Sequence, residues 1–213
     1  MGLSIARCIL LIAIIFFSPG CPAAQQATLL VFGDSLSAGY GLAQNTGWVD
    51  LLQRRLQEKQ LPYRVVNASI SGETTAGANV RLEAILKQYQ PNLVVVELGG
   101  NDGLRGLSLA SVRKNLDAMI RLCLMKGAKV LLIGIRLPTN YGKTYTEKFQ
   151  GIFVELAQRH RVPLVPSLMT GFETRRELFQ PDGIHPAAAA QTIMLDNVWQ
   201  QLKPLIASYA TKQ

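Results

Sequence analysis

The sequence predicts a single α/β domain in which helices cover both faces of a mostly parallel sheet. From residue 28 onward, short β-rich apolar runs alternate with longer stretches of helical periodicity, which is typical of β-α units. The runs are almost continuously apolar, as strands must be when both faces of a sheet are buried. No repeat with a period of about 20 to 50 residues and no long linker interrupts the alternation, so we expect no second domain.

Five segments are predicted to be strands because each is short, apolar and rich in β-branched residues. They cover residues 28–32, 63–69, 93–98, 129–135 and 162–166. In doubly wound folds ligands bind beyond the carboxyl ends of the strands, so the loops that follow these segments are the first places to look for a functional site.

The stretches between the strands are predicted to be the crossover helices that parallel neighbours require. In the first of them, Trp48, Leu52 and Leu56 fall on one stripe, while Arg54 and Glu58 face elsewhere. Further helices are expected over residues 75–89, 109–126, 145–160 and 187–208.

Residues 1–24 have the pattern of a secretory signal peptide, because Arg7 precedes an apolar run over residues 8–17 that is followed by small residues and prolines. The run is shorter than the about 20 apolar residues of a membrane-spanning helix, although a retained N-terminal anchor is the alternative. We expect cleavage near Ala23 or Ala24, which leaves residues 25–213 as one mature domain in the periplasm or outside the cell.

The cysteines predict a thiol in the core and no disulfide in the mature chain. Cleavage would remove Cys8 and Cys21 and leave Cys123 within an apolar helix, where a buried structural role is expected. Lipidation of Cys21 is the lesser alternative to secretion, because the preceding residues 18–20 match a lipoprotein signal only at the glycine.

The chain is basic, with 22 Lys and Arg against 14 Asp and Glu and a formal net charge of +8. The basic residues are scattered singly or as pairs such as Arg54-Arg55, with no aromatic platform beside them, so we expect a solvated surface and no nucleic-acid partner. Transient contact with membrane lipids would be a side effect of this charge, and we expect a monomer.

A serine in a glycine-bounded turn carries the clearest chemical signal. Ser35 directly follows the first predicted strand, in Gly33-Asp-Ser-Leu-Ser-Ala-Gly39. A serine hydroxyl becomes a nucleophile only when a base accepts its proton, and the chain contains two histidines. His160 lies between two arginines at the end of a predicted helix, where we expect a surface residue, so His185 is the candidate base.

His185 lies in a turn-rich segment at the entrance of the last predicted helix, where Pro186 suits the first helical position. Asp182 can fold back to accept the Nδ1 proton of His185, which leaves Nε2 free to take a proton from Ser35. In the structural alternative, Asp34 or Ser35 caps a helix and Asp182 closes a turn. The order Ser, Asp, His, with the serine at a strand end, favours catalysis.

Two further loops offer donors for an oxyanion. Gly72 follows the second predicted strand, and its amide can approach a ligand closely because glycine has no side chain. Asn101 follows the third strand, and its carboxamide offers a directed N–H. Tight turns are the alternative explanation for both loops.

Four sequence blocks resemble those of the SGNH or GDSL hydrolase family and occur in the family's order: Gly33-Asp-Ser-Leu-Ser37, Gly72, Gly100-Asn-Asp102 and Asp182-Gly-Ile-His-Pro186. The resemblance implies a three-layer, flavodoxin-like α/β/α sandwich with five parallel strands and a reaction without metal or cofactor. It also implies that Ser35, Asp182 and His185 are catalytic, and that Gly72, Asn101 and the Ser35 amide form the oxyanion hole.

Longer strings over residues 66–72, 96–106 and 135–138 resemble the family's branch of multifunctional acyl thioesterases, lysophospholipases and arylesterases. This resemblance implies acyl thioester, lysophospholipid and aryl ester substrates. It further implies that the acyl chain is covered by five residues, namely Leu104, Arg105, Gly106, Leu107 and Ser108.

Three other functions are alternatives for this sequence. A carbohydrate or peptide O-acetylesterase would use the same residues on a shorter acyl group. A phosphate- or flavin-binding module fits poorly, because the loop after the first strand lacks both glycine-rich phosphate-binding patterns. A metal-dependent hydrolase fits less well still, because two distant histidines and one mature cysteine form no recognisable ligand set.

Overall fold

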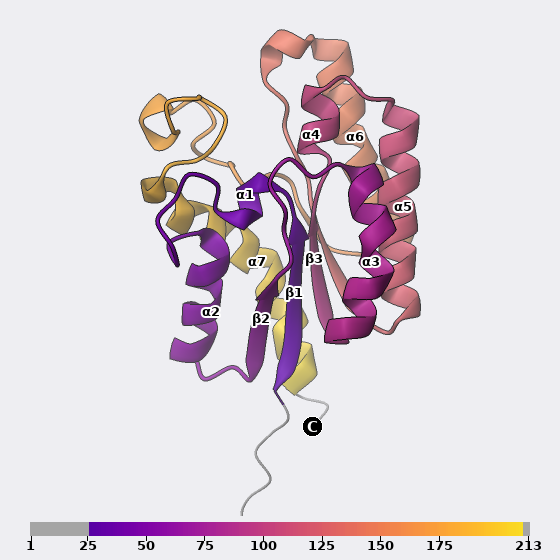
Figure 1. Cartoon of the computed structure of the whole chain (residues 1–213), viewed down its shortest axis with the longest axis vertical. Coiled ribbons are helices and arrows are strands. Elements are labelled where there is room, and N and C mark those ends of the chain that lie inside the picture. The colour runs from indigo at the N-terminus through magenta and orange to yellow at the C-terminus, as the bar shows by residue number, and fades with distance from the viewer. Residues whose placement is uncertain (1–25, 211–213) are drawn as a thin grey trace, which may run out of the picture.

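The computed structural model describes residues 26–210 and contains one five-stranded sheet (Figure 1). The strands are β1 (Ala27–Gly33), β2 (Tyr63–Asn67), β3 (Leu93–Glu97), β4 (Lys129–Ile133) and β5 (Leu164–Val165). They are all parallel and lie in the order β2-β1-β3-β4-β5, which is the flavodoxin-like order. The predicted α/β/α sandwich with five parallel strands is therefore confirmed.

Seven α-helices occur in the described residues: α1 (Ser35–Ala38), α2 (Trp48–Glu58), α3 (Thr75–Tyr89), α4 (Gly100–Leu104), α5 (Leu109–Met125), α6 (Lys143–His160) and α7 (Gln191–Ala210). Three short 3₁₀ turns occupy Thr139–Tyr141, Arg176–Leu178 and Ala188–Ala190. Helices α2 and α7 cover one face of the sheet, and α3, α5 and α6 cover the other (Figure 1).

Strand β1 lies in the middle of the molecule, and all seven of its residues are buried. Leu30 and Phe32 pack in the core beneath α3, α5 and α6, whereas Leu29 and Val31 pack in the core beneath α2 and α7. This two-sided burial explains why the strands are continuously apolar in sequence. It also places the end of β1 between β2 and β3, where the chain crosses to opposite sides and a doubly wound fold opens a crevice.

The prediction that Pro186 opens the last helix is wrong. Helix α7 begins at Gln191, directly after the 3₁₀ turn Ala188–Ala190, and Pro186 lies before both. Phe179 and Pro186 form an antiparallel bridge, and the Gln180 N–H donates to the His185 carbonyl at 2.7 Å. These backbone bonds across the loop keep His185 out of the helix. The predicted signal peptide, with Cys8 and Cys21, lies outside the described residues.

Candidate active site

Ser35 lies in the turn that connects β1 to the short helix α1. Asp34 is the N-cap of this helix, and its Oδ1 accepts the Leu36 N–H at 3.0 Å. Gly39 ends the helix with φ of 75°, a left-handed conformation that favours glycine. The predicted capping role of Asp34 is thus present, and it holds Ser35 at the carboxyl edge of the sheet.

The loop before α7 brings His185 to Ser35, although 150 residues separate them in sequence. The Nε2 atom of His185 lies 2.9 Å from Ser35 Oγ, and its Nδ1 atom lies 2.7 Å from Asp182 Oδ2. Because an ionised carboxylate can only accept, it selects the tautomer with the proton on Nδ1 and leaves Nε2 to accept the serine proton. The three residues therefore form a continuous hydrogen-bonded chain with the geometry of a serine hydrolase triad.

Asp182 also closes the turn that carries His185. Its Oδ1 accepts the backbone N–H of Ile184 at 2.9 Å and that of His185 at 3.0 Å. Partial burial works to raise the pKa of Asp182, but the hydrogen bonds from the His185 backbone, the His185 ring and Ile184 outweigh it and lower the pKa to about 2. Asp182 is therefore ionised at neutral pH, so the turn role and the orienting role coexist in one side chain.

Two residues that sequence reasoning did not single out support His185. The ring of Tyr40 lies against the imidazole, with centroids 4.5 Å apart. Gln180 Nε2 donates to the Tyr40 carbonyl at 2.8 Å and to the Pro186 carbonyl at 3.2 Å, which ties the two sides of the site together. The sequence feature that could have indicated Tyr40 is its position directly after Gly39, at the end of the turn that carries Ser35.

Asn101 lies on α4, between the Ser35 turn and the loop that contains Gly72. Its Nδ2 donates to Asp34 Oδ2 at 3.2 Å and to the Glu73 carbonyl at 3.0 Å. Each of these acceptors is a chain neighbour of a predicted oxyanion-hole residue, so Ser35, Gly72 and Asn101 converge on one region. Both Nδ2 protons already have acceptors, so donation to a substrate oxyanion requires that one of them be shared or released.

Asp102 joins the Asn101 helix α4 to the start of α3, behind the Gly72 loop. Its carboxylate accepts the Thr75 hydroxyl at 2.6 Å and the Thr75 backbone N–H at 2.9 Å, and both residues are buried. Thr75 is the first residue of α3 and follows the Gly72 loop closely. Gly72 itself has φ of 79°, which a residue with a side chain rarely adopts.

The predicted acyl-covering segment lies beside this region. Leu104 is half-buried, and residues 105–108 are exposed. Arg105 donates to the Gly72 carbonyl at 3.2 Å, and the Tyr141 hydroxyl donates to the Leu104 carbonyl at 3.0 Å. The segment is thus attached to the Gly72 loop on one side and to the chain after β4 on the other.

Glu97 is a further residue of this region that the sequence prediction missed. It is the last residue of β3, is fully buried, and accepts the Ser37 hydroxyl at 2.7 Å on its Oε2. Its signal in the sequence was an acidic residue at the end of an otherwise apolar strand. Burial of a carboxyl group costs free energy unless the group is hydrogen-bonded, so such a residue indicates a specific role.

The remaining candidates lie away from Ser35. Cys123 is buried in the core, as predicted. His160 is less exposed than predicted, because its Nε2 pairs with Asp117 at 2.8 Å and only 11% of its side chain is exposed. Among the described residues, no group of three or more His, Cys, Asp or Glu could hold a metal ion, and no helix is long and apolar enough to cross a membrane.

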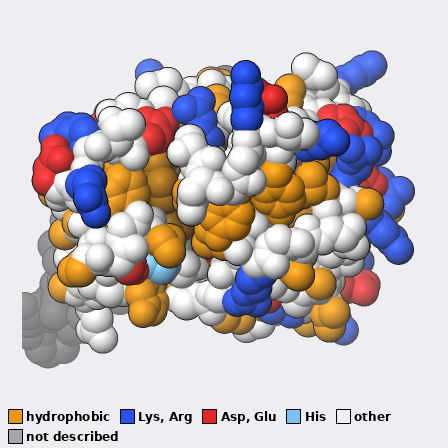
Figure 2. All heavy atoms as spheres, turned by 90° about the horizontal axis from the view of Figure 1, so that it is seen from above, with side chains coloured by type: hydrophobic (Ala, Val, Ile, Leu, Met, Phe, Trp, Pro, Cys, Tyr) orange, Lys and Arg blue, Asp and Glu red, His pale blue; other side chains and the backbone are white. Residues whose placement is uncertain are grey.

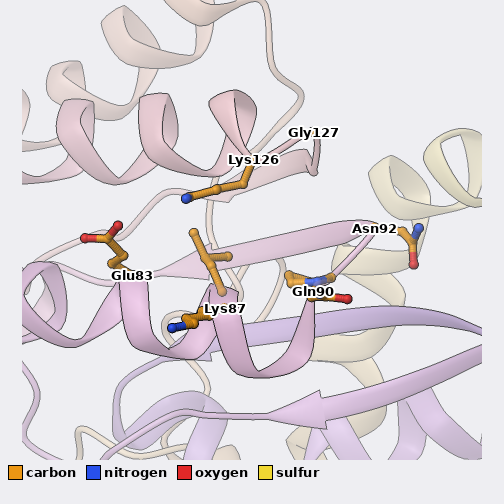
Figure 3. Close-up of a pocket in the computed structure, with 8 residues that line it drawn as sticks. Glu83, Lys87, Gln90, Asn92, Lys126 and Gly127 are labelled. Atoms are coloured by element: carbon orange, nitrogen blue, oxygen red, sulfur yellow. The ribbon is translucent and has the colours of Figure 1, made fainter.

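The molecular surface supports a site at the carboxyl edge of the sheet. Figure 2 shows that hydrophobic side chains gather in hollows on this face, flanked by Lys and Arg side chains, with a histidine at one side. A pocket of about 430 Å³ lies at the opposite edge (Figure 3), where residues 90–92 and 126–127 precede β3 and β4. Glu83, Lys87 and Lys126 extend from its rim, and its lining contains no serine, cysteine or histidine, so we assign no catalysis to it.

Comparisons with known proteins show similarity over most of the chain. Residues 31–193 match the model of the GDSL-like lipase/acylhydrolase family. Esterase TesA of Pseudomonas aeruginosa is 52% identical over 185 residues, which cover 85% of this chain and 92% of that protein. Thioesterase 1/protease 1/lysophospholipase L1 of Escherichia coli is 45% identical over 184 residues, which cover 86% and 87%.

A solved structure of TesA superposes on the chain with a TM-score of 0.82 at 52% identity, covering 84% of this chain and 99% of that one.

Proposed function

Because the chain belongs to the GDSL-like lipase/acylhydrolase family, we propose that it hydrolyses acyl esters and acyl thioesters through an acyl-enzyme on Ser35. The observation that carries the proposal is the hydrogen-bonded chain from Ser35 through His185 to Asp182, at 2.9 and 2.7 Å. A single buried or capping serine would not need a histidine and a carboxylate in this order.

In the first half of the reaction, Ser35 Oγ forms a bond to the acyl carbon while its proton passes to His185 Nε2. The tetrahedral intermediate then collapses, the bond to the leaving sulfur or oxygen breaks, and Nε2 returns the proton to the leaving thiol or alcohol. Asp182 stays ionised throughout and stabilises the imidazolium that forms. In the second half, a water molecule gives its proton to Nε2 and attacks the acyl-enzyme, which releases the acid and restores the Ser35 hydroxyl.

The negative charge of the tetrahedral intermediate requires donors that are in place beforehand. We assign this role to the Ser35 and Gly72 backbone amides and to Asn101 Nδ2. The bond from Asn101 to Asp34 is the longer of its two bonds, at 3.2 against 3.0 Å, so it is the one expected to yield when an oxyanion forms.

Substrate specificity is assigned to the segment from Leu104 to Ser108, which would cover the acyl chain. Its exposed position beside the Gly72 loop, to which Arg105 donates a hydrogen bond, supports acyl groups longer than acetyl. A chain-length series of nitrophenyl esters and acyl-CoA thioesters tests this assignment. Activity confined to acetyl esters would contradict it and favour an O-acetylesterase.

Replacement of the nucleophile tests the central proposal. Purified Ser35→Ala protein should lose hydrolysis of both nitrophenyl esters and acyl-CoA, because His185 then has no hydroxyl to activate. Ser111→Ala, an exposed serine on α5, is the matched control and should retain the parent rate. Full esterase activity in folded Ser35→Ala protein would remove the proposed mechanism.

We also propose that residues 1–24 direct export and are cleaved, so that the enzyme works in the periplasm or outside the cell as a monomer. The mass of the mature protein tests the cleavage, and a lipid adduct on Cys21 would contradict it. Gel filtration with light scattering tests the monomer.

Transient contact with lipid membranes is proposed for the face that holds Ser35. Ile70, Leu107 and Ile184 are 50%, 41% and 43% exposed on loops of this face, and the chain is basic. Their replacement by serine should reduce co-sedimentation with phosphatidylglycerol vesicles, whereas Val80→Ser, 86% exposed on α3, should not. Equal binding by all of these variants would contradict the proposal.

A further inference from the structure

Glu97 occupies an unusual place for an acidic residue. It ends the apolar strand β3, its exposed fraction is 0%, and in the sheet register it lies opposite Gly33 of β1. Its carboxyl group therefore lies directly beneath the turn that carries Ser35.

One oxygen atom of Glu97 contacts both sides of that turn. Oε2 accepts the hydroxyl of Ser37 at 2.7 Å and faces the backbone N–H of Asp34 at 3.4 Å. Asp34 stands one position before Ser35, and Ser37 stands two positions after it. A shift of this oxygen would therefore move the backbone on both sides of the nucleophile. The Ser37 carbonyl of the same turn accepts Asn67 Nδ2 at 2.7 Å.

The carboxyl group fills space that a side chain at position 33 would need. A Cβ atom on Gly33 would lie 2.7 Å from Glu97 Oε2 and 2.8 Å from Ser37 Oγ. Gly33 has no unusual φ, so close approach of the carboxyl and the hydroxyl accounts for the glycine. Gly33, Ser37 and Glu97 thus form one packed unit under Ser35.

The protonation state of Glu97 follows from its surroundings. Burial, together with the nearby Asp34 carboxyl, raises the pKa of Glu97 well above its ordinary value. Its Oε1 is buried and has no hydrogen-bond partner among the described residues, so a charge there would be poorly compensated. A neutral carboxyl group fits, with Oε2 as the carbonyl oxygen that accepts from Ser37.

We propose that Glu97 is a positioning residue for the nucleophile, which acts as a neutral hydrogen-bond acceptor that sets the backbone of residues 34–37 and hence the direction of Ser35 Oγ. The inference rests on the proposed role of Ser35. Misplacement of a reacting group by about 1 Å can cost about 10²-fold in rate, so loss of this acceptor is expected to be visible in kcat.

Three variants separate positioning from packing. Glu97→Gln keeps a neutral acceptor of the same shape, Glu97→Leu removes the acceptor, and Ser37→Ala removes the donor while Glu97 stays. Val96→Ala is the matched control, because it weakens the buried core one residue earlier on β3 without touching the turn. Each variant is assayed for kcat, KM and thermal unfolding, and for the rate at which a fluorophosphonate labels Ser35.

The proposal expects Glu97→Leu to lose about 10²-fold in kcat with little change in KM, and to be labelled correspondingly slowly. Glu97→Gln should retain most of the parent kcat, which a charged role would not allow. Ser37→Ala should lose about 2- to 10-fold in kcat, the size of one hydrogen bond, and it decides the matter if Glu97→Leu does not fold. Val96→Ala should unfold at a lower temperature but keep the parent kcat.

Parent kcat and labelling rate in folded Glu97→Leu or Ser37→Ala would overturn the proposal. Equal losses in Glu97→Gln and Glu97→Leu would overturn the neutral-acceptor role. Failure of the proposed function is seen separately, since Ser35→Ala would then remain active whatever the Glu97 variants do.

Discussion

The buried carboxyl of Asp34, next to Ser35, should lower the free energy of unfolding at neutral pH by a measurable amount. Asp34 is 2% exposed, and burial raises its pKa from 3.8 to about 6 against the hydrogen bonds from Leu36 and Asn101. The folded protein therefore binds this proton more tightly than the unfolded chain does. Its contribution to stability is lost as the pH rises from 3.8 to about 6. The full loss corresponds to about 3 kcal/mol.

Asp34→Asn should reverse the sign of its effect on stability between pH 4 and pH 7. The asparagine Oδ1 can still accept the Leu36 N–H, but its amide nitrogen cannot accept from Asn101, which loses about 1 kcal/mol. At pH 4 the parent carboxyl is mostly neutral in the folded protein but about half ionised in the unfolded chain, so the variant should be less stable by about 0.5 kcal/mol. At pH 7 the variant avoids the buried charge and should be more stable by about 2 kcal/mol. Turnover should fall, because Asn101 loses the acceptor that orients it.

Urea unfolding of the parent and the variant at both pH values gives the two free-energy differences directly. Asp196→Asn is the control, because this side chain is 56% exposed and pairs with Arg55 at the surface. Its effect should stay below about 1 kcal/mol at either pH. An Asp34→Asn protein that is less stable than the parent by the same amount at pH 4 and pH 7 would refute the reasoning.

Three further outcomes are expected. Asn101→Ala should lower kcat/KM by about 10²- to 10³-fold if its Nδ2 serves the oxyanion, and steady-state kinetics with a nitrophenyl ester checks this; a loss below about threefold would speak against that role. Gly33→Ala should lower the free energy of unfolding by about 1–3 kcal/mol, because its Cβ would meet Glu97 Oε2 and Ser37 Oγ, and an unchanged urea midpoint would contradict the close packing. Cys123, whose pKa burial raises to about 12, should react with a thiol reagent only as fast as the protein unfolds, and rapid labelling of the native enzyme would show that the thiol is accessible.

Most of the fold could be predicted because its signals are local. All five strands and five of the helices occur where apolar runs and helical periodicity place them, and most ends differ by a few residues. Helix α4 was not predicted, because Gly100-Asn-Asp-Gly103 has weak helix propensity. A Cβ on Gly103 would lie 2.6 Å from Leu137, so these glycines serve close packing that only the folded chain makes visible.

The start of α7 shows the same limit. Pro186 has the local preference of a first helical residue, but backbone bonds across the loop from Leu178 to Ala187 keep it out of a helix. Local preference is worth little against several hydrogen bonds formed across a loop, so the position of His185 depended on those bonds rather than on the proline.

The sequence by itself determined the chemical groups and their order: a serine after the first strand, glycine and asparagine donors after the next two, and an Asp-Gly-Ile-His turn near the end. These features could be predicted because strand ends and turns depend on residues that are neighbours in the sequence. Tertiary structure alone decided that Ser35 and His185 meet at 2.9 Å, that both Nδ2 protons of Asn101 already have acceptors, and that Glu97 lies beneath the nucleophile. Such contacts join residues 28 to 150 positions apart, and their distances are set by how the layers pack, which no local pattern encodes.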